Sequence, residues 1–416
     1  MKRILCWVLP LLLLLGGCHL NTSVGEEEEK WEASSPMESA EAMPAVEDYK
    51  AFAALLSAAL IDGQGNKNLS PVSVYLALAM AAEGANGQTR AELLDLLGAK
   101  SLEDLRKSVE GMLNSLPLSG ETGELILANS IWLGEQAGGA AFHEAYLKTL
   151  KDSYKAEAQA VCFGEAAAGQ RIAAWIREKT RDKVKVSEDA MQFDADTLAV
   201  LLNTIYLKDG WRQPFDRDRT ETGVFHGLNG QESSVKYMRR TDSAGTIVRG
   251  RGFLRYAMPL SEVGRMVFVL PDEGVALESL LGSRERIDEL LNGGDKTVAD
   301  VSVMVPKFSF QDRTDLEETL MDLGVRTCFT GGADFSAMTD TPAHISRVLQ
   351  ESHIGVDENG VTAAAYTMIV MTKSAAMFSE RERVDFHLTR PFLYAIESPD
   401  GTVLFIGTVT SPDEAR

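Results

Sequence analysis

Apolar residues recur at helical spacing through the first third of the chain. The pattern over residues 46–61 predicts an amphipathic helix. Ser70 followed by Pro71 is typical of a helix start, because serine caps the first turn and proline suits the first helical position. Residues 89–92 read TRAE, a capping box that predicts another helix starting at Thr89. A fourth helix is expected near residues 166–181.

Strand patterns dominate the last half. Residues 198–207 read LAVLLNTIYL, a nearly continuous apolar run that predicts a strand covered on both faces. Asn203 in its middle needs a buried partner. Further strands are predicted at residues 266–270, 301–305, 392–396 and 403–406, the last two joined by a turn. Because helices come first and strands later, the expected class is α+β, in one domain from residue 46 to residue 416.

The N-terminus has the pattern of a targeting segment. Residues 1–17 combine Lys2 and Arg3 with an apolar stretch too short to span a bilayer, which predicts a secretory signal peptide. Cys18 follows directly, and the ending LGGC resembles a bacterial lipobox, in which the cysteine becomes lipidated. An ordinary signal peptide with an incidental cysteine is the alternative. Residues 18–45 are acidic and poor in apolar residues, so we expect a solvated tether between a membrane-anchored lipid and the domain.

Composition and charge narrow the function classes. The 416 residues are 45% hydrophobic and 25% charged, the mix of a globular protein with a sizeable core. The net charge of −20 repels phosphate backbones, so we expect no nucleic-acid partner. The four cysteines form no C-x-x-C pair, and no G-x-S-x-G, H-E-x-x-H or P-loop motif occurs. Residues 233–236 match S-x-x-K without its partner motifs. We therefore expect no enzyme, no metal and no cofactor.

One segment is unusual for a globular surface. Residues 358–365 read ENGVTAAA, and they lead into the strand-forming residues 367–371 and then a polar stretch that ends near Arg383. An exposed edge strand is one interpretation, although proteins usually protect such edges. The other is a strand held outside a sheet that it can later enter.

This segment resembles the hinge and reactive loop of the serpin family, and six blocks elsewhere agree with it. They include N-L-S-P-V-S at the predicted second helix, N-T-I-Y-L-K-D-G-W in the long apolar strand, and R-P-F before the last two strands. The blocks keep the family's order across about residues 46–412. They lie at residues 68–73, 84–89, 203–215, 305–308, 333–336 and 390–392.

The resemblance implies a fold and an activity. It implies three β-sheets, eight to nine helices and an exposed reactive loop at about residues 358–385, in a monomer. It implies a suicide inhibitor of a serine, or else a cysteine, protease: the loop is cleaved, inserts into the large sheet and traps the acyl-enzyme. The alternative is a non-inhibitory serpin acting as a surface binding protein. The expected location is the membrane, reached by secretion across the inner membrane, on the periplasmic face or the cell surface.

The family motif also assigns roles to residues. In the family the scissile bond lies about sixteen or seventeen residues along when the hinge glutamate counts as the first. With Glu358 as that residue the bond is expected at Lys373-Ser374, which suits a trypsin-like target; small shifts of the cut to neighbouring bonds leave elastase-like and papain-like targets open. The polar cluster under the sheet, called the shutter, carries over to Ser70, Ser73, Asn203 and Gln350. The last position is often histidine in the family, so the amide here removes a pH-dependent group. The hinge residues are Glu358, Asn359, Gly360, Val361, Thr362, Ala363, Ala364 and Ala365.

The side chains of the hinge suit burial. A strand alternates faces with period two. If Val361 faces the core, Ala363, Ala365 and Thr367 do so too, and none of them brings a charge into the sheet. Thr362, Ala364 and Tyr366 then face outward; Tyr366 stands where the family usually has a small residue, which the outward face tolerates.

Overall fold

The computed structural model describes residues 44–116, 120, 123–134, 142–180, 182, 193, 197, 199–361 and 381–412. Residues 43–416 form one compact unit. Within the described residues, no helix has the length and apolar character needed to cross a membrane.

Eight α-helices lie in the described residues, most of them in the first half. Four of them lie where the sequence patterns predicted helices. The helices are α1 (Pro44–Leu60), α2 (Pro71–Gly84), α3 (Gly87–Leu96), α4 (Leu102–Ser115), α5 (Glu144–Tyr154), α6 (Ala166–Lys179), α7 (Arg284–Asn292) and α8 (Glu317–Asp322).

The capping box predicted at Thr89 is wrong. Helix α3 begins at Gly87, with Asn86 at the N-cap. The Thr89 hydroxyl instead accepts a hydrogen bond from the Asp334 amide, and the Glu92 carboxylate accepts from the amides of Arg326 and Thr327. Both side chains therefore hold a distant segment, a use that local spacing does not reveal.

A six-stranded sheet contains the first residues of the predicted hinge that form a strand, Gly360 and Val361. Its order is β10-β11-β12-β4-β2-β3, and β11 also pairs directly with β4. The strands are β10 (Phe308–Asp315), β11 (Ile345–Val356), β12 (Gly360–Val361), β4 (Ala199–Gly210), β2 (Glu124–Gly134) and β3 (Glu157–Val161).

The remaining strands form a nine-stranded array in the order β1-β15-β14-β8-β7-β6-β9-β13, with β5 paired to β6. The long strand β6 joins two sheets in this array, because its first part pairs with β5 and its last residues pair with β7. The hydrogen bonding of this array is continuous; divided at β6 into two sheets, it gives with the six-stranded sheet the three sheets expected of an α+β serpin fold. The strands are β1 (Lys67–Leu69), β5 (Glu221–His226), β6 (Glu232–Gly250), β7 (Phe253–Pro259), β8 (Arg265–Pro271), β9 (Asp295–Pro306), β13 (Arg383–His387), β14 (Phe392–Glu397) and β15 (Val403–Val409).

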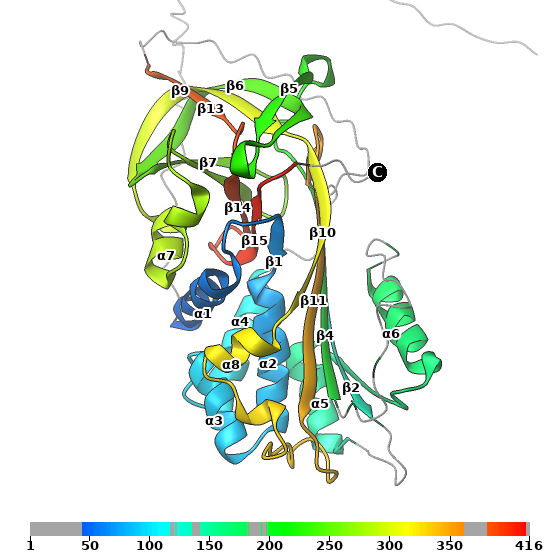
Figure 1. Cartoon of the computed structure of the whole chain (residues 1–416). Helices are drawn as coiled ribbons and strands as arrows, with labels where there is room; N and C mark the ends of the chain where they lie inside the picture. Colours follow the sequence, from blue (N-terminus) through cyan, green and yellow to red (C-terminus); the bar gives the residue numbers. More distant parts are fainter. Residues whose placement is uncertain are drawn as a thin grey trace, which may run out of the picture. The chain divides into compact units, whose positions relative to one another are not determined.

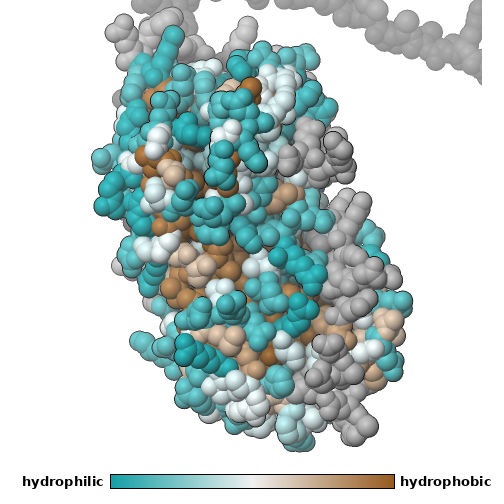
Figure 2. All heavy atoms as spheres, in the orientation of Figure 1, coloured by the Kyte–Doolittle hydropathy of each residue, from teal (hydrophilic) through white to brown (hydrophobic). Residues whose placement is uncertain are grey.

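At β4 the six-stranded sheet is covered on both faces, as the apolar run of that strand predicts, whereas β10 and β11 keep partly exposed residues on one face. Helices α2 and α6 lie on opposite sides of the sheet (Figure 1). All of α2 is buried, which explains its alanine-rich sequence, and α6 packs Trp175 and Ile172 against Trp132 of β2. Hydrophobic side chains reach the surface in the middle of the face in Figure 2. Few large ones are exposed in the described part of the chain: Leu147, Val224 and Val298.

Candidate functional site

The site lies at the seam where β11 meets β4. The two strands pair in parallel from Ile345 to Glu351, so that Gln350 lies opposite Asn203. Beyond this stretch β12 takes the place between them. Val361 pairs with Val356 of β11 and with Asp209 of β4. The first residues of the predicted hinge thus already lie between the two strands at one end of the seam.

Backbone contacts from the end of β4 hold the hinge. The Trp211 amide donates to the Asn359 carbonyl at 2.8 Å, and its indole Nε1 donates to the Asp357 carbonyl at 2.8 Å. The Phe215 amide donates to the Glu358 carbonyl at 2.9 Å. Trp211 and Phe215, from the W…P-F block of the sequence, therefore hold the hinge backbone in place.

The Glu358 side chain is buried and fully partnered. Lys307 Nζ lies 3.0 Å from Oε2, and the Thr220 hydroxyl donates to Oε1 at 2.9 Å. Burial raises the pKa of Glu358, but hydrogen bonds from its own backbone, Lys307 and Thr220 outweigh this, and the pKa lies below the ordinary value. The ion pair fixes the residue from which the loop departs.

We expect Glu358→Gln to destabilise the protein at pH 7 by roughly 1–2 kcal/mol, through loss of the charged hydrogen bonds. Because the folded-state pKa is depressed, this stabilisation is full above the unfolded pKa of about 4.3 and disappears as pH falls through the folded pKa. Denaturant unfolding of both proteins between pH 7 and pH 3 measures the difference. A difference that does not shrink on acidification would contradict the role of the charge.

Gly360 is where the hinge comes closest to β4. A Cβ atom at this position would lie 2.0 Å from the Asp209 carbonyl oxygen and 2.7 Å from the Gly210 Cα. Those neighbours are backbone atoms of a buried strand, so they cannot yield as a flexible side chain would. The glycine is thus required for the hinge to enter the sheet.

Gly360→Ala should release β12 from the seam and cost about 1–3 kcal/mol of stability, as overpacking does. Gly210→Ala is a matched control, because its nearest neighbours would lie at an ordinary 3.5 Å. Amide hydrogen exchange at Trp211, whose partner is the Asn359 carbonyl, reports the release. Equal protection of Trp211 in both variants would rule out this reading of Gly360.

The four predicted shutter residues are buried, and the structure joins three of them, Ser70, Ser73 and Gln350, while Asn203 bonds to a residue outside the set. Gln350 Nε2 donates to the Ser70 carbonyl and its Oε1 accepts from the Ser70 amide, both at 2.8 Å. The hydroxyls of Ser70 and Ser73 lie 3.0 Å apart. Asn203 Nδ2 instead donates to Asn129 Oδ1 on β2. Gln350 thus bonds to α2 and Asn203 to β2, so these side chains place no hydrogen bond across the β11–β4 seam.

The sequence analysis missed several residues of the site. Asn129 interrupts an apolar strand as Asn203 does, which was an available signal. Asp209 gave no signal, yet its Oδ2 accepts from the amides of Glu262 and Val263 beside the hinge, and burial raises its pKa. Asp357 is a third, because its carboxylate accepts from the amides of Asn359 and Gly360.

Other predicted residues fall outside the described part of the chain. They are Cys18, Thr362, Ala363, Ala364, Ala365, Lys373 and Ser374. Where the structure does describe the chain, no group of three or more His, Cys, Asp and Glu side chains is arranged to hold a metal ion. The described site is therefore the place where β11 and β4 stop pairing with each other and β12 begins to lie between them.

The chain has recognisable relatives. The family model described as "Serpin (serine protease inhibitor)" matches residues 47–412. Serpin B6 of Pongo abelii is 30% identical over 363 residues, 84% of this chain and 94% of that protein. An uncharacterized serpin-like protein of Methanosarcina mazei is 26% identical, covering 99% of this chain and 98% of its own.

A solved structure shares the fold. The native state of tengpin, a thermophilic serpin, superposes with a TM-score of 0.78 at 27% identity, and the match covers 88% of this chain and 94% of that one. The family match spans both the seam and the segment that enters it. On these grounds the chain belongs to the serpin family.

Proposed function

We propose that this protein is a suicide inhibitor of a serine protease, whose cleaved loop inserts between β11 and β4 and traps the acyl-enzyme. Serpins are generally protease inhibitors rather than enzymes. The observation that carries the proposal is β12: Gly360 and Val361 already pair with β4 at the entrance of the seam. Val361 is 1% exposed and belongs to the core, so the following residues can extend a strand without a charge entering the interior.

The proposed scissile bond is Lys373-Ser374, and the proposed targets are trypsin-like. Incubation with trypsin should give a complex that survives SDS, together with a C-terminal fragment that begins at Ser374. Lys373→Ala should weaken this inhibition selectively, while Arg381→Ala, a basic control further along the loop, should not. Clean cleavage without a complex across trypsin-, elastase- and papain-like enzymes would favour the non-inhibitory binding protein instead.

We further propose that the domain is a monomer anchored to a membrane through a lipid on Cys18, after removal of residues 1–17 during secretion. Cys18→Ala should abolish membrane association, because an acyl anchor contributes about 0.8 kcal/mol per buried CH₂. Partitioning of both proteins into a detergent phase measures this. The thermal unfolding midpoint serves as control and should not change. A variant that still enters the detergent phase would exclude lipidation at Cys18.

A further inference from the structure

Opening the seam requires half of the six-stranded sheet to move. A strand that enters between β11 and β4 separates them by one more strand spacing, about 4.8 Å. Strands β2 and β3 follow β4 in the sheet, so they travel with it. A hydrogen bond near 2.8 Å cannot span such a displacement. Contacts between the two halves therefore break or slide during insertion.

Helix α2 is tied to the β11 half. Its N-terminal Ser70 makes both backbone hydrogen bonds to Gln350 of β11. The strand before it, β1, pairs with β15, and the Asn68 carbonyl of β1 accepts from Ser352 of β11 at 2.6 Å. Helix α2 should thus remain with β11 when the seam opens.

Helix α5 is tied to the other half. It ends at Tyr154, and β3 begins at Glu157, so only two residues separate the helix from a strand that pairs with β2. Displacing β3 by a strand spacing must therefore pull on the C-terminal end of α5. The interface between α2 and α5 is where the two halves slide.

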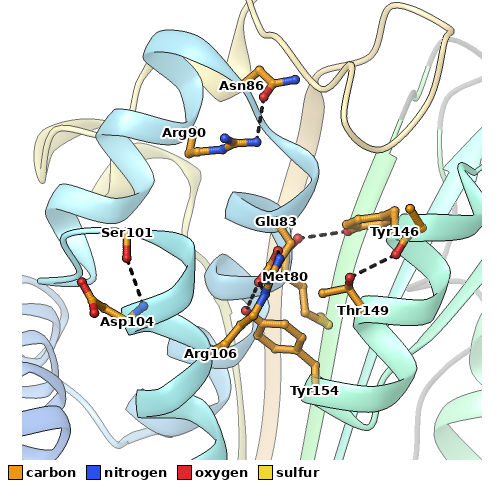
Figure 3. Close-up of polar contacts among 11 residues, drawn as sticks. Met80, Glu83, Asn86, Arg90, Ser101, Asp104, Arg106, Tyr146, Thr149 and Tyr154 are labelled. Atoms are coloured by element: carbon orange, nitrogen blue, oxygen red, sulfur yellow. Dashed lines mark hydrogen bonds and ion pairs between the residues drawn. The ribbon is translucent and has the colours of Figure 1, made fainter.

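A buried polar cluster, Glu83 with Arg106 and Tyr154, lies on that interface (Figure 3). Glu83, in the last turn of α2, has a side chain only 2% exposed. Arg106 of α4 binds it through two nitrogens, at 2.6 and 2.5 Å. The Tyr154 hydroxyl of α5 donates to Glu83 Oε1 at 2.8 Å. A carboxylate at a helix C-terminus opposes the helix dipole, so Glu83 depends on these partners.

A second tyrosine of α5 contacts α2 one turn earlier. The Tyr146 hydroxyl donates to the Met80 carbonyl at 3.0 Å. Burial first, and then the charge of Glu83, raise the pKa of both tyrosines, so their hydroxyls stay protonated donors. The start of α5 also contacts the segment before β11, through the His143 amide and the Met338 carbonyl. The side chains of His143 and Asp340 lie 3.1 Å apart there, and because Asp340 is almost fully exposed their pairing is worth little.

We propose that Tyr154, through its hydrogen bond to the buried Glu83, is a positioning residue that sets the rate of loop insertion, by holding α5 and its half-sheet against α2 until the seam opens. This rests on the proposed insertion. The bond is made in the closed seam and lost as α5 moves, so its removal favours the opening step. Arg106 still neutralises Glu83 when the tyrosine hydroxyl is absent, so the fold survives the change.

The test compares Tyr154→Phe with Tyr394→Phe. Tyr394 is equally buried and donates to Asn68 at 2.8 Å, but it joins two strands on the same side of the seam. Seam opening is measured by adding a synthetic peptide of residues 361–371 and following its incorporation on native gels, which needs no protease. Tyr154→Phe should take up the peptide about three- to tenfold faster than the wild type, and Tyr394→Phe at an unchanged rate. Tyr146→Phe should act in the same direction as Tyr154→Phe.

The outcomes are separable. Equal rates in Tyr154→Phe and Tyr394→Phe, at equal losses of thermal stability, would overturn the positioning role, and so would a wild type that takes up no peptide. A wild type that takes up the peptide but traps no protease would refute the proposed function alone. Faster uptake by both α5 variants would support the inference. A lower stoichiometry of inhibition in Tyr154→Phe would then extend it to the protease reaction.

Discussion

Cleavage within the loop should raise the thermal unfolding midpoint by roughly 20 °C. About ten inserted residues gain ladder hydrogen bonds to both β4 and β11, each worth ~1 kcal/mol, and ~2 °C accompanies each kcal/mol in a protein of this size. The entrance is prepared, because Val361 already lies between Val356 and Asp209. The uncleaved loop cannot complete this strand while both of its ends are attached, since the chain returns to the fold at β13.

Differential scanning calorimetry of intact and loop-cleaved protein measures the gain, and mass spectrometry verifies that the cut lies within residues 371–374, so that about ten residues are free to insert. Equal midpoints would mean that the loop does not insert. The same comparison without the hinge glycine, in Gly360→Ala, should show a smaller gain, because the first paired residue no longer fits against Asp209.

Ala363→Arg should convert the inhibitor into a substrate. Val361 is buried, and strand alternation puts Ala363 on the same inward face as insertion proceeds. An unpaired guanidinium would then enter the apolar layer between the sheet and α2, at a cost of several kcal/mol. Slowed insertion gives the acyl-enzyme time to hydrolyse, so the protease is released active.

Ala364→Arg is the matched control, because it places the same charge one residue further along on the outward face. Titration of a trypsin-like protease gives the stoichiometry of inhibition for both variants. The expected result is a stoichiometry at least about tenfold higher for Ala363→Arg than for Ala364→Arg, since 1.4 kcal/mol already changes a rate ratio tenfold. Similar values in the two variants would show that the assignment of faces is wrong.

The helices and strands that could be predicted from the sequence are those with a clear local pattern. The run from 198 to 207 became β4 because its residues are buried on both faces, and Ser70-Pro71 opened α2 as expected. The capping box predicted at Thr89 was wrong because the Thr89 hydroxyl accepts a hydrogen bond from the amide of Asp334, more than two hundred residues away. Local spacing describes only local partners, so a tertiary contact can redirect a capping residue.

At the site, too, the positions of the residues could be predicted, but their tertiary partners could not. Family motifs located Glu358, Ser70 and Asn203, and the structure places all three in buried polar surroundings. Which neighbours the shutter side chains bond to could not be predicted, because a buried amide can turn toward either side. Asn203 bonds to Asn129 rather than to α2. The role of Glu83 could not be predicted from its own helix, because its partners, Arg106 and Tyr154, lie on two helices that come later in the chain.

A crystal structure of the loop-cleaved protein tests the central claim most directly. In the intact chain Gln350 and Asn203 are direct neighbours across the seam. The account predicts that residues 361–371 occupy a new strand between them, which doubles the separation of β11 and β4 to about 9.5 Å at that pair. A cleaved structure in which Gln350 and Asn203 remain paired, with the loop outside the sheet, would contradict it.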